Sequence, residues 1–276
     1  MIRLLVSADD FGSGPGRNRG IIEAFLHGIV TGASLLANGP AFADAVALAR
    51  AHALPVGVHL NLSEGRAVSG PIAGITDGSG HFAGKGELRQ RLLAGDFDAA
   101  AVATELRAQI ARIRAAGLDP DHLDTHQHCL LFPALTAIVA AVAKSSGIKT
   151  LRLPLPLEPA AADPDGPLGA ELALYRALAP ACAATLHAAG CVTPDGLCGM
   201  PLLDRLEEEH LLRTLTDLPA GTWELMTHPG HVDRGHPFSG PERVTELAAL
   251  TAPAVHAEIV RRGIALVSFC ELPCAS

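Results

Sequence analysis

Short apolar runs alternate with segments of helical periodicity along the chain, and this alternation constrains the fold more than any other feature. The runs are typical of buried strands, and the segments between them repeat apolar residues every three or four positions. Strand, helix and strand in that order predict an α/β fold, a parallel sheet with right-handed crossovers. The predicted strands are 4–8, 31–39, 55–62, 122–126, 150–154, 221–230 and 264–269, with weaker candidates at 192–193 and 197–200. The predicted helices are 18–28, 41–52, 88–116, 133–144, 172–189, 202–218 and 241–262, with a break at Pro180.

The length of 276 residues fits one α/β barrel. No internal repeat or linker divides the chain, so we expect a single domain over 1–276. Two stretches rich in Gly and Pro lack periodicity and predict loop insertions near 63–86 and 156–169. Such loops at strand ends tend to cover sites.

Composition excludes several classes of protein. Hydrophobic residues make up 49% of the chain, yet no apolar run reaches the roughly 18 residues of a spanning helix, so we expect no membrane span. The formal charge of −8 without a basic cluster argues against a nucleic-acid partner. The N-terminus lacks the pattern of a secretory signal, which predicts a cytoplasmic protein. The six cysteines form no CxxC pair and predict free thiols.

Two adjacent carboxylates, Asp9 and Asp10, stand where the first predicted strand ends. Successive side chains of a strand point to opposite sides, so one carboxylate can face a metal while the other lies beside it as a base. A structural alternative is an Asx turn with an acidic helix cap, and these residues alone do not separate the two.

Polar residues also follow other predicted strands at their carboxyl ends. In parallel barrels and open α/β sheets the site is built at that edge, which predicts that Asp9, Asp10, His59, His126 and His228 converge. One carboxylate with two neutral imidazoles is a recurrent ligand set that leaves positions open for water and substrate. The pattern therefore predicts a catalytic metal.

The segment His122-Leu123-Asp124-Thr125-His126-Gln127-His128 holds more candidates than one metal can use. We favour His126 as the ligand, with His128 as a candidate to replace or assist it. Asp124 has the character of an acceptor that fixes an imidazole tautomer, and His122 is equally well explained as a packed core residue.

Two further residues extend the predicted site. His228 precedes a turn at the end of a late strand, from which a general acid could reach the opposite side of a bound substrate. Arg152 lies at the end of the fifth predicted strand and could orient Asp9 or a substrate oxygen. The structural alternatives are a turn-stabilising role for His228 and a surface ion pair for Arg152.

Four motifs, each present once, are spread in order over nearly the whole chain. They are Asp9-Asp10-Phe11-Gly12 with Asn18 and Gly20, Gly57-Val58-His59, His122 to His128, and Thr227-His228-Pro229. Together they resemble the YdjC-like (ChbG-type) carbohydrate deacetylase family. The resemblance implies a distorted (β/α) barrel of mainly parallel strands, related in logic to the NodB-type deacetylases. It also implies a divalent metal, usually magnesium, and removal of acetyl groups from N-acetylated sugars such as chitooligosaccharides.

Carried over residue by residue, the resemblance makes Asp10, His59 and His126 the metal ligands, Asp9 the base and His228 the acid. The roles of Asp9 and Asp10 are borrowed by analogy with NodB-type enzymes and could be reversed. Imidazole ligands suit zinc or another transition metal better than magnesium, so the metal stays open between Mg²⁺ and Zn²⁺.

The natural sugar and the oligomeric state stay open at this point. The run 151–154 with nearby 157–159 resembles the branch associated with hopanoid biosynthesis, which points to a lipid-linked sugar or a glycosylated metabolite. With the family's oligosaccharides, the substrate stays open among an oligosaccharide, a glycolipid and a glycosylated metabolite. Whether the chain forms a homo-oligomer cannot be read from the sequence.

Two alternatives to a deacetylase remain. Another metal-dependent hydrolase on the same scaffold, such as a phosphoesterase, would need a basic phosphate cradle or a second carboxylate cluster, and neither is visible. A non-catalytic sugar-binding protein would lack a base or an acid, whereas Asp9 and His228 are both present.

Overall fold

The computed structural model describes residues 1–158 and 169–272 of the chain. Most of the predicted insertion at 156–169 and one cysteine, Cys274, lie outside the described residues. The five described cysteines are free thiols, as predicted.

One parallel sheet contains every strand of the described residues. Its order is β5-β4-β3-β2-β1-β7-β6, and β8 pairs with β1. The strands are β1 (Ile2–Phe11), β2 (Gly32–Leu35), β3 (Val56–Leu60), β4 (His122–Thr125), β5 (Thr150–Leu151), β6 (Gly196–Cys198), β7 (Gly221–Thr227) and β8 (Ile264–Leu266).

Strand β1 has three partners because it is longer than its neighbours. It pairs with β7 from Ile2 to Ala8, with β8 along its first residues and with β2 from Ser7 onward. The apolar residues of β1, including Leu4, Leu5 and Val6, are fully buried. The first strand is therefore the centre of the sheet.

The two ends of the sheet approach each other through irregular bridges. Pro156, beyond β5, pairs with Leu197 of β6, and Leu157 N donates to Leu197 O at 2.8 Å. Pro154 and Pro156 carry no N–H donors, so a regular ladder cannot form there. This geometry confirms the predicted distorted barrel of parallel strands.

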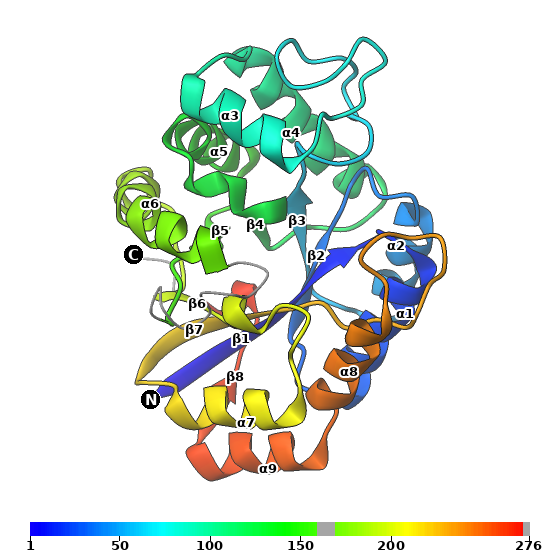
Figure 1. The fold of residues 1–276 in the computed structure, drawn as a ribbon, viewed down its shortest axis with the longest axis vertical. Helices are drawn as coiled ribbons and strands as arrows, with labels where there is room; N and C mark the ends of the chain where they lie inside the picture. The colour runs from blue at the N-terminus through cyan, green and yellow to red at the C-terminus, as the bar shows by residue number, and fades with distance from the viewer. Residues whose placement is uncertain (159–168, 273–276) are drawn as a thin grey trace.

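Helices surround the outside of the curved sheet (Figure 1). They are α1 (Pro15–His27), α2 (Phe42–His52), α3 (Lys85–Ala94), α4 (Ala99–Ala115), α5 (Pro133–Ser146), α6 (Gly169–Ala188), α7 (Glu208–Asp217), α8 (Pro241–Leu250) and α9 (Pro253–Arg262). Among the described helices, none combines the length and apolar character needed to cross a bilayer.

Two segments predicted as single helices are each divided. The segment 88–116 breaks where Gly95 adopts φ 69°, and Asp98 then caps α4 by accepting from the N–H groups of Ala100 and Ala101. The segment 241–262 breaks before Pro253, which begins α9 because proline fits the first turn of a helix.

Two further predictions about helices are wrong. Helix α6 runs through Pro180, whose side chain is exposed, while its neighbours Ala179 and Cys182 pack in the core. Packing of the buried face thus outweighs the missing hydrogen bond. The helix predicted from residue 202 begins only at Glu208, after a short 3₁₀ turn at Met200–Leu202.

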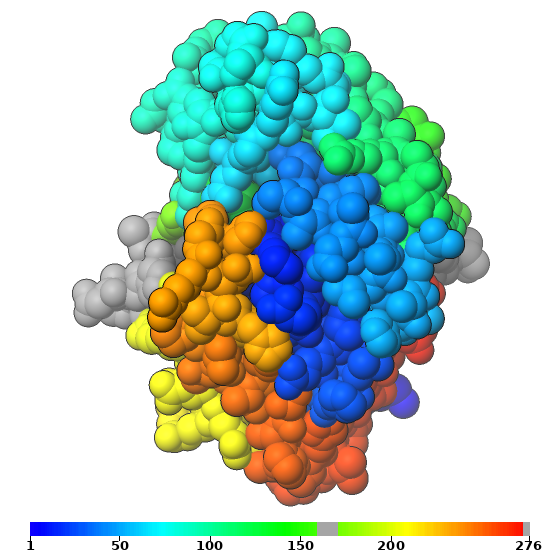
Figure 2. Space-filling view, turned by 90° about the vertical axis from the view of Figure 1, so that its right-hand side faces the viewer, coloured from blue at the N-terminus to red at the C-terminus, as the bar shows by residue number. Residues whose placement is uncertain are grey.

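Segments far apart in the sequence meet beside β1. Figure 2 shows the orange segment before α8 lying against the blue N-terminal region. His231 N donates to Gly16 O at 3.0 Å, and Gly16 N donates to Asp233 Oδ2 at 3.0 Å. These bonds tie the turn after β7 to the start of α1.

The contact between α1 and this turn generates a stability prediction. A Cβ on Gly20 would lie 2.4 Å from Gly230 Cα, and Gly230 N is itself bonded to Arg243 O at 3.1 Å. We expect Gly20→Ala to lower the free energy of unfolding by about 1–3 kcal/mol, because neither backbone can withdraw freely. Urea denaturation measures the change.

The control is Gly86→Ala, also within a helix, where an added Cβ meets nothing within 4 Å. We expect it to stabilise the protein by up to about 1 kcal/mol, since alanine favours helix more than glycine. Equal effects of the two substitutions would contradict the packing argument.

Candidate metal centre and active site

The two carboxylates at the end of β1 are separated by an irregularity of the strand. The register between β1 and β2 shifts between Ala8 and Phe11, and Asp10 adopts φ 62°. A bulge re-aims side chains, and a left-handed aspartate is an uncommon, strained conformation. Asp9 and Asp10 therefore both reach the same cavity, although they are adjacent in the strand.

Asp10, His59 and His126 form a compact cluster. Asp10 Oδ1 lies 3.4 Å from His59 Nε2 and 3.1 Å from His126 Nδ1, and the two ring nitrogens are 3.2 Å apart. Within the described residues Asp10 Oδ1 is buried and has no hydrogen-bond partner that meets normal geometry. A buried carboxylate oxygen between two imidazole nitrogens fits a divalent ion. The structure thus brings together the three residues predicted as ligands.

The rings of His59 and His126 lie among carboxylates that favour their protonated forms. Burial opposes protonation of His59, but Asp124 and Asp10 outweigh it and raise its pKa to about 10. Burial is likewise outweighed at His126, where Asp10 raises the pKa to about 9. Burial opposes ionisation of Asp10 in turn, and the two histidines hold its pKa well below the usual value.

Arg152 is fully buried and binds three carboxylates. Its guanidinium donates to both oxygens of Asp9 at 2.6 and 2.7 Å, and Nη1 lies 2.6 Å from Asp124 Oδ2. Nε donates to Glu224 Oε1 at 2.9 Å. The exposed ion pair considered for Arg152 is therefore wrong.

The same network sets the state of the carboxylates. Asp124 Oδ1 accepts from His59 Nδ1 at 2.9 Å, which leaves His59 Nε2 facing Asp10. Burial opposes ionisation of Asp124, but Arg152 and His59 lower its pKa below the usual value. For Asp9, burial exceeds the attraction of Arg152 and His59, and its pKa is raised.

His128 lies apart from the cluster. Gln127 and His128 both adopt positive φ, 58° and 57°, within the 3₁₀ segment His126–Leu131. This turn directs the His128 ring to the edge of Tyr175, at 5.4 Å between centroids. Burial, with Arg152 nearby, holds the pKa of His128 well below its usual value. His128 lines the cavity but does not join the three clustered residues.

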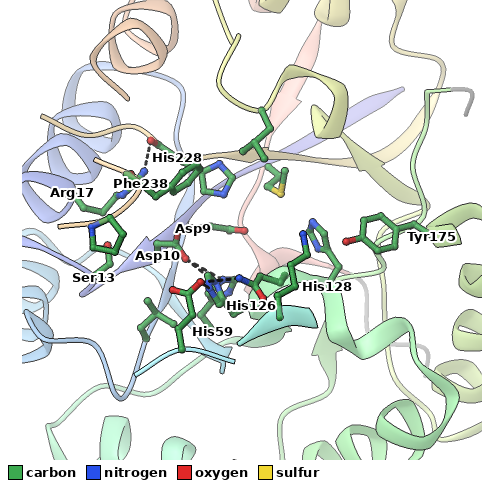
Figure 3. A pocket seen from close by; sticks show the side chains of 17 residues that line it. Asp9, Asp10, Ser13, Arg17, His59, His126, His128, Tyr175, His228 and Phe238 are labelled. Carbon is green, nitrogen blue, oxygen red and sulfur yellow. Dashed lines mark hydrogen bonds and ion pairs between the residues drawn. The ribbon is translucent and has the colours of Figure 1, made fainter. Parts of the chain in front are cut away.

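His228 follows β7 and lies across the cavity from His59 and His126 (Figure 3). Its backbone N donates to Glu246 Oε1 at 2.7 Å, and Arg17 donates to its carbonyl. The His228 and Phe238 rings pack edge to face, with 5.2 Å between their centroids. Burial, with Arg243 nearby, holds its pKa well below the usual value, so the ring is neutral.

A cavity of about 270 Å³ lies over these residues. Asp9, Asp10, His59, His126 and His228 all line it, so the structure brings the five predicted strand-end residues to one space. Its apolar wall is formed by Leu36, Leu203, Met226, Pro237 and Phe238.

His122 lies in the interior. Its Nδ1 is 2.6 Å from Asp121 Oδ1, its Nε2 is 3.3 Å from Ser34 Oγ, and its ring stacks on Phe269 at 3.8 Å. These contacts agree with a packed core residue.

Sequence reasoning missed two acids. Glu224 is fully buried beside Arg152, and a charged residue between Trp223 and Leu225 in an apolar strand was a readable signal. Glu64 lies beside His126, with its carboxylate 3.4 Å from Nε2. It belongs to the long loop after β3, where no periodicity marked it.

The fold and the site place this protein in one class: α/β barrels of parallel strands that carry a carboxylate and two histidines clustered at the carboxyl edge of the sheet. The family model described as YdjC-like protein matches residues 3–261, and the chain belongs to that family.

Several related proteins match nearly the whole length of the chain. It is 37% identical to a mouse carbohydrate deacetylase, over 98% of this chain and 95% of the mouse protein. It is 33% identical to a chitooligosaccharide deacetylase of Serratia marcescens, over 98% of each. A solved structure of a putative cellobiose-phosphate cleavage protein from Enterococcus faecalis is similar with TM-score 0.74 and 26% identity, covering 97% of each chain.

The buried arginine generates a second stability prediction. Arg152→Met would leave the carboxylates of Asp9, Asp124 and Glu224 buried without their shared cation. We expect a loss of about 3–5 kcal/mol in the free energy of unfolding at pH 7, measured with urea. The control Arg213→Met breaks an exposed pair with Glu209 and should change stability by no more than about 0.5 kcal/mol. A loss as small as the control's would contradict the network's role.

The raised pKa values of His59 and His126 generate a prediction for metal binding. Metal binding requires neutral imidazoles, whereas both rings are mostly protonated at neutral pH when their pKa values are about 10 and about 9. We expect Zn²⁺ affinity to rise from pH 6 to pH 8, with protons released on binding. Calorimetry in buffers of different ionisation enthalpy measures the release. Binding without net proton release would contradict the assigned protonation states.

Proposed function

We propose that this protein is a metal-dependent carbohydrate N-deacetylase, which hydrolyses the N-acetyl amide of an amino sugar to acetate and a free amine. One observation carries the proposal: Asp9, oriented by Arg152, lies beside the cluster of Asp10, His59 and His126, with His228 across the same cavity. Amide hydrolysis needs this combination of a base, an electrophilic centre and an acid. The names of the related proteins support a carbohydrate substrate.

Asp10, His59 and His126 would hold the metal. When bound, a divalent ion there would polarise an amide carbonyl and lower the pKa of a water molecule. Two imidazoles and one carboxylate favour Zn²⁺ or another transition metal, whereas Mg²⁺, the metal that the family resemblance implies, prefers oxygen ligands. We therefore propose a transition metal as the working ion.

We assign Asp9 the role of general base. Both of its oxygens accept from Arg152, which fixes the orientation of the carboxylate, and each oxygen keeps a second lone pair. Burial raises its pKa, which makes Asp9 a better proton acceptor than an ordinary aspartate. Asp10 is the weaker candidate because two histidines lie against its buried Oδ1 and lower its pKa.

We assign His228 the role of delivering a proton to the leaving amine, which is a poor leaving group unless protonated. The ring is neutral in the free protein, so it must first take up a proton from solvent, when negative charge develops in the cavity, and it then passes that proton to the amine. An imidazolium whose pKa is depressed is a strong acid, suited to this step. The anchoring of its backbone by Arg17 and Glu246 keeps the ring in place.

The side chains that line the cavity favour binding of a sugar over binding of a phosphate group. Among the described residues that line it, the cations are already engaged: Arg17 donates to main-chain carbonyls, and Lys85 Nζ lies 2.6 Å from Glu171 Oε1. A phosphoesterase would need free cations facing the reacting centre. The apolar wall with Phe238 suits the C–H face of a sugar ring.

Acetate release from a panel of substrates tests the function. The panel contains N-acetylated mono- and oligosaccharides, glycolipids and glycosylated metabolites, with a phosphate monoester as a comparison. Purified protein is assayed with and without added Zn²⁺ or Mg²⁺ and after treatment with a chelator. We expect metal-dependent acetate release from at least one N-acetylated sugar. Binding of sugars without any acetate release would favour the non-catalytic alternative, and phosphate release alone would favour the phosphoesterase.

The variant Asp9→Asn tests the base. It keeps the shape of the side chain but cannot accept the proton, so we expect activity to fall by about 10²–10⁴-fold with the fold retained by circular dichroism. Asp119→Asn, an exposed aspartate far from the cavity, is the matched control and should keep full activity. Full activity in Asp9→Asn would refute the assignment.

A further inference from the structure

His126 presents one ring nitrogen to the cluster and the other to a loop. Nδ1 lies 3.1 Å from Asp10 Oδ1 and 3.2 Å from His59 Nε2, so Nδ1 is the nitrogen that would bind a metal. A neutral ring that binds through Nδ1 must carry its proton on Nε2. Glu64 Oε1 lies 3.4 Å from that Nε2, and no described residue makes a hydrogen bond of normal geometry to it.

The other histidine is arranged in the opposite sense. His59 faces the cluster with Nε2, and its Nδ1 donates to Asp124 at 2.9 Å. In each ring, the nitrogen that points away from the cluster faces a carboxylate. This carboxylate is Asp124 for His59 and Glu64 for His126. Partners of this kind fix the tautomer of a metal-binding histidine and raise its basicity.

Glu64 is held in place by its own main chain. Glu64 N donates to Asn61 Oδ1 at 3.0 Å, and Glu64 O accepts from the side-chain amides of Asn38 and Asn61, each at 2.9 Å. Gln109 then fixes Asn61, accepting from its N–H at 2.9 Å and donating to its carbonyl at 2.7 Å. The loop leaves β3 in one defined path.

A hydrogen bond also orients the Glu64 carboxylate toward His126. Gln127 Nε2 donates to Glu64 Oε1 at 2.8 Å, and this oxygen is the one nearest His126. Glu105, a fully buried acid of α4, accepts from the N–H groups of Val68 and Ser69 and secures the loop beyond Glu64. A buried acid bonded to two loop amides is a strong anchor.

We propose that Glu64 is the positioning residue of His126: it accepts the Nε2 proton and so keeps Nδ1 free for the metal. Glu64 is not a ligand in this arrangement, because its carboxylate lies at Nε2, whereas the cluster lies at Nδ1. The inference rests on the metal-dependent function proposed above and adds a residue to it.

Zn²⁺ binding to the full chain tests this role. Affinity is measured by competition with a chromophoric chelator for the wild type, Glu64→Gln and Glu64→Ala. We expect alanine to weaken binding by about 10–100-fold, as loss of such a partner does elsewhere. Glu64→Gln keeps a hydrogen-bond acceptor without the charge, so its Zn²⁺ affinity should lie between those of the wild type and Glu64→Ala. The control Glu87→Ala removes an exposed acid of α3 paired with Arg91 and should bind as the wild type does.

A second readout separates tautomer control from simple loss of negative charge. In ¹⁵N-labelled metal-free protein at pH above 9, the ring nitrogens of His126 report the share of the Nε2–H tautomer, which Glu64 beside Nε2 favours and Asp10 beside Nδ1 opposes. In Glu64→Ala the Nδ1–H tautomer should increase. Wild-type Zn²⁺ affinity in Glu64→Ala, equal affinity in the alanine and glutamine variants, or an unchanged tautomer would each overturn the proposal.

These results are distinguishable from failure of the proposed function. If the wild type binds Zn²⁺ and releases acetate while Glu64→Ala binds equally well, only the role of Glu64 is wrong. If the wild type binds no divalent ion, the metal centre itself is wrong and the role of Glu64 falls with it.

Discussion

The site depends on the buried guanidinium of Arg152. It lies between carboxylates from three strands, Asp9 of β1, Asp124 of β4 and Glu224 of β7, and all four groups are buried. Burying carboxylates without a cationic partner is costly, and this one guanidinium contacts all three acids. Protonated His59 supplies a second positive charge on the far side of Asp124.

The four histidines of the cavity divide into two pairs according to their neighbours. His59 and His126 lie within hydrogen-bond reach of carboxylates, and their pKa values are raised. His128 and His228 are also buried but have aromatic rings and arginines around them, and their pKa values are lowered. One pair is thus suited to hold a cation in place of protons, and the other pair is neutral where substrate would bind.

The sequence allowed the parallel sheet and the gathering of strand-end residues to be predicted, because both follow from strand direction alone. Asp10, His59 and His126 come from three different strand ends, and chain order was enough to place them at one edge. The exclusion of His128 could not be predicted, since it depends on two left-handed residues that no glycine marked.

Arg152 and Glu64 show two other limits of sequence reasoning. Burial of an arginine depends on acids that are distant in the chain, so local pattern gave no means of separating a core residue from a surface one. Glu64 lies in a loop fixed by Gln109 and Glu105 of a helix that follows much later. Hydrogen bonds between a loop and a distant helix produce no periodic pattern in the sequence. Helix ends were misjudged where the Asp98 cap or Pro253 in a first helical turn, rather than apolar spacing, decided them.

The three partners of β1 bear on how the chain assembles as it is synthesised. Strand β1 leaves the ribosome first, yet β7 and β8, which cover most of its length, are made last. Until they arrive, β1 can pair only with β2, through its final residues. Strand β1 therefore spends most of translation with one edge unpaired, although His59 and His126, the two histidines that cluster with Asp10, are made long before β7. His228 follows β7, so the side of the cavity opposite His59 and His126 is the last part of the site to be made.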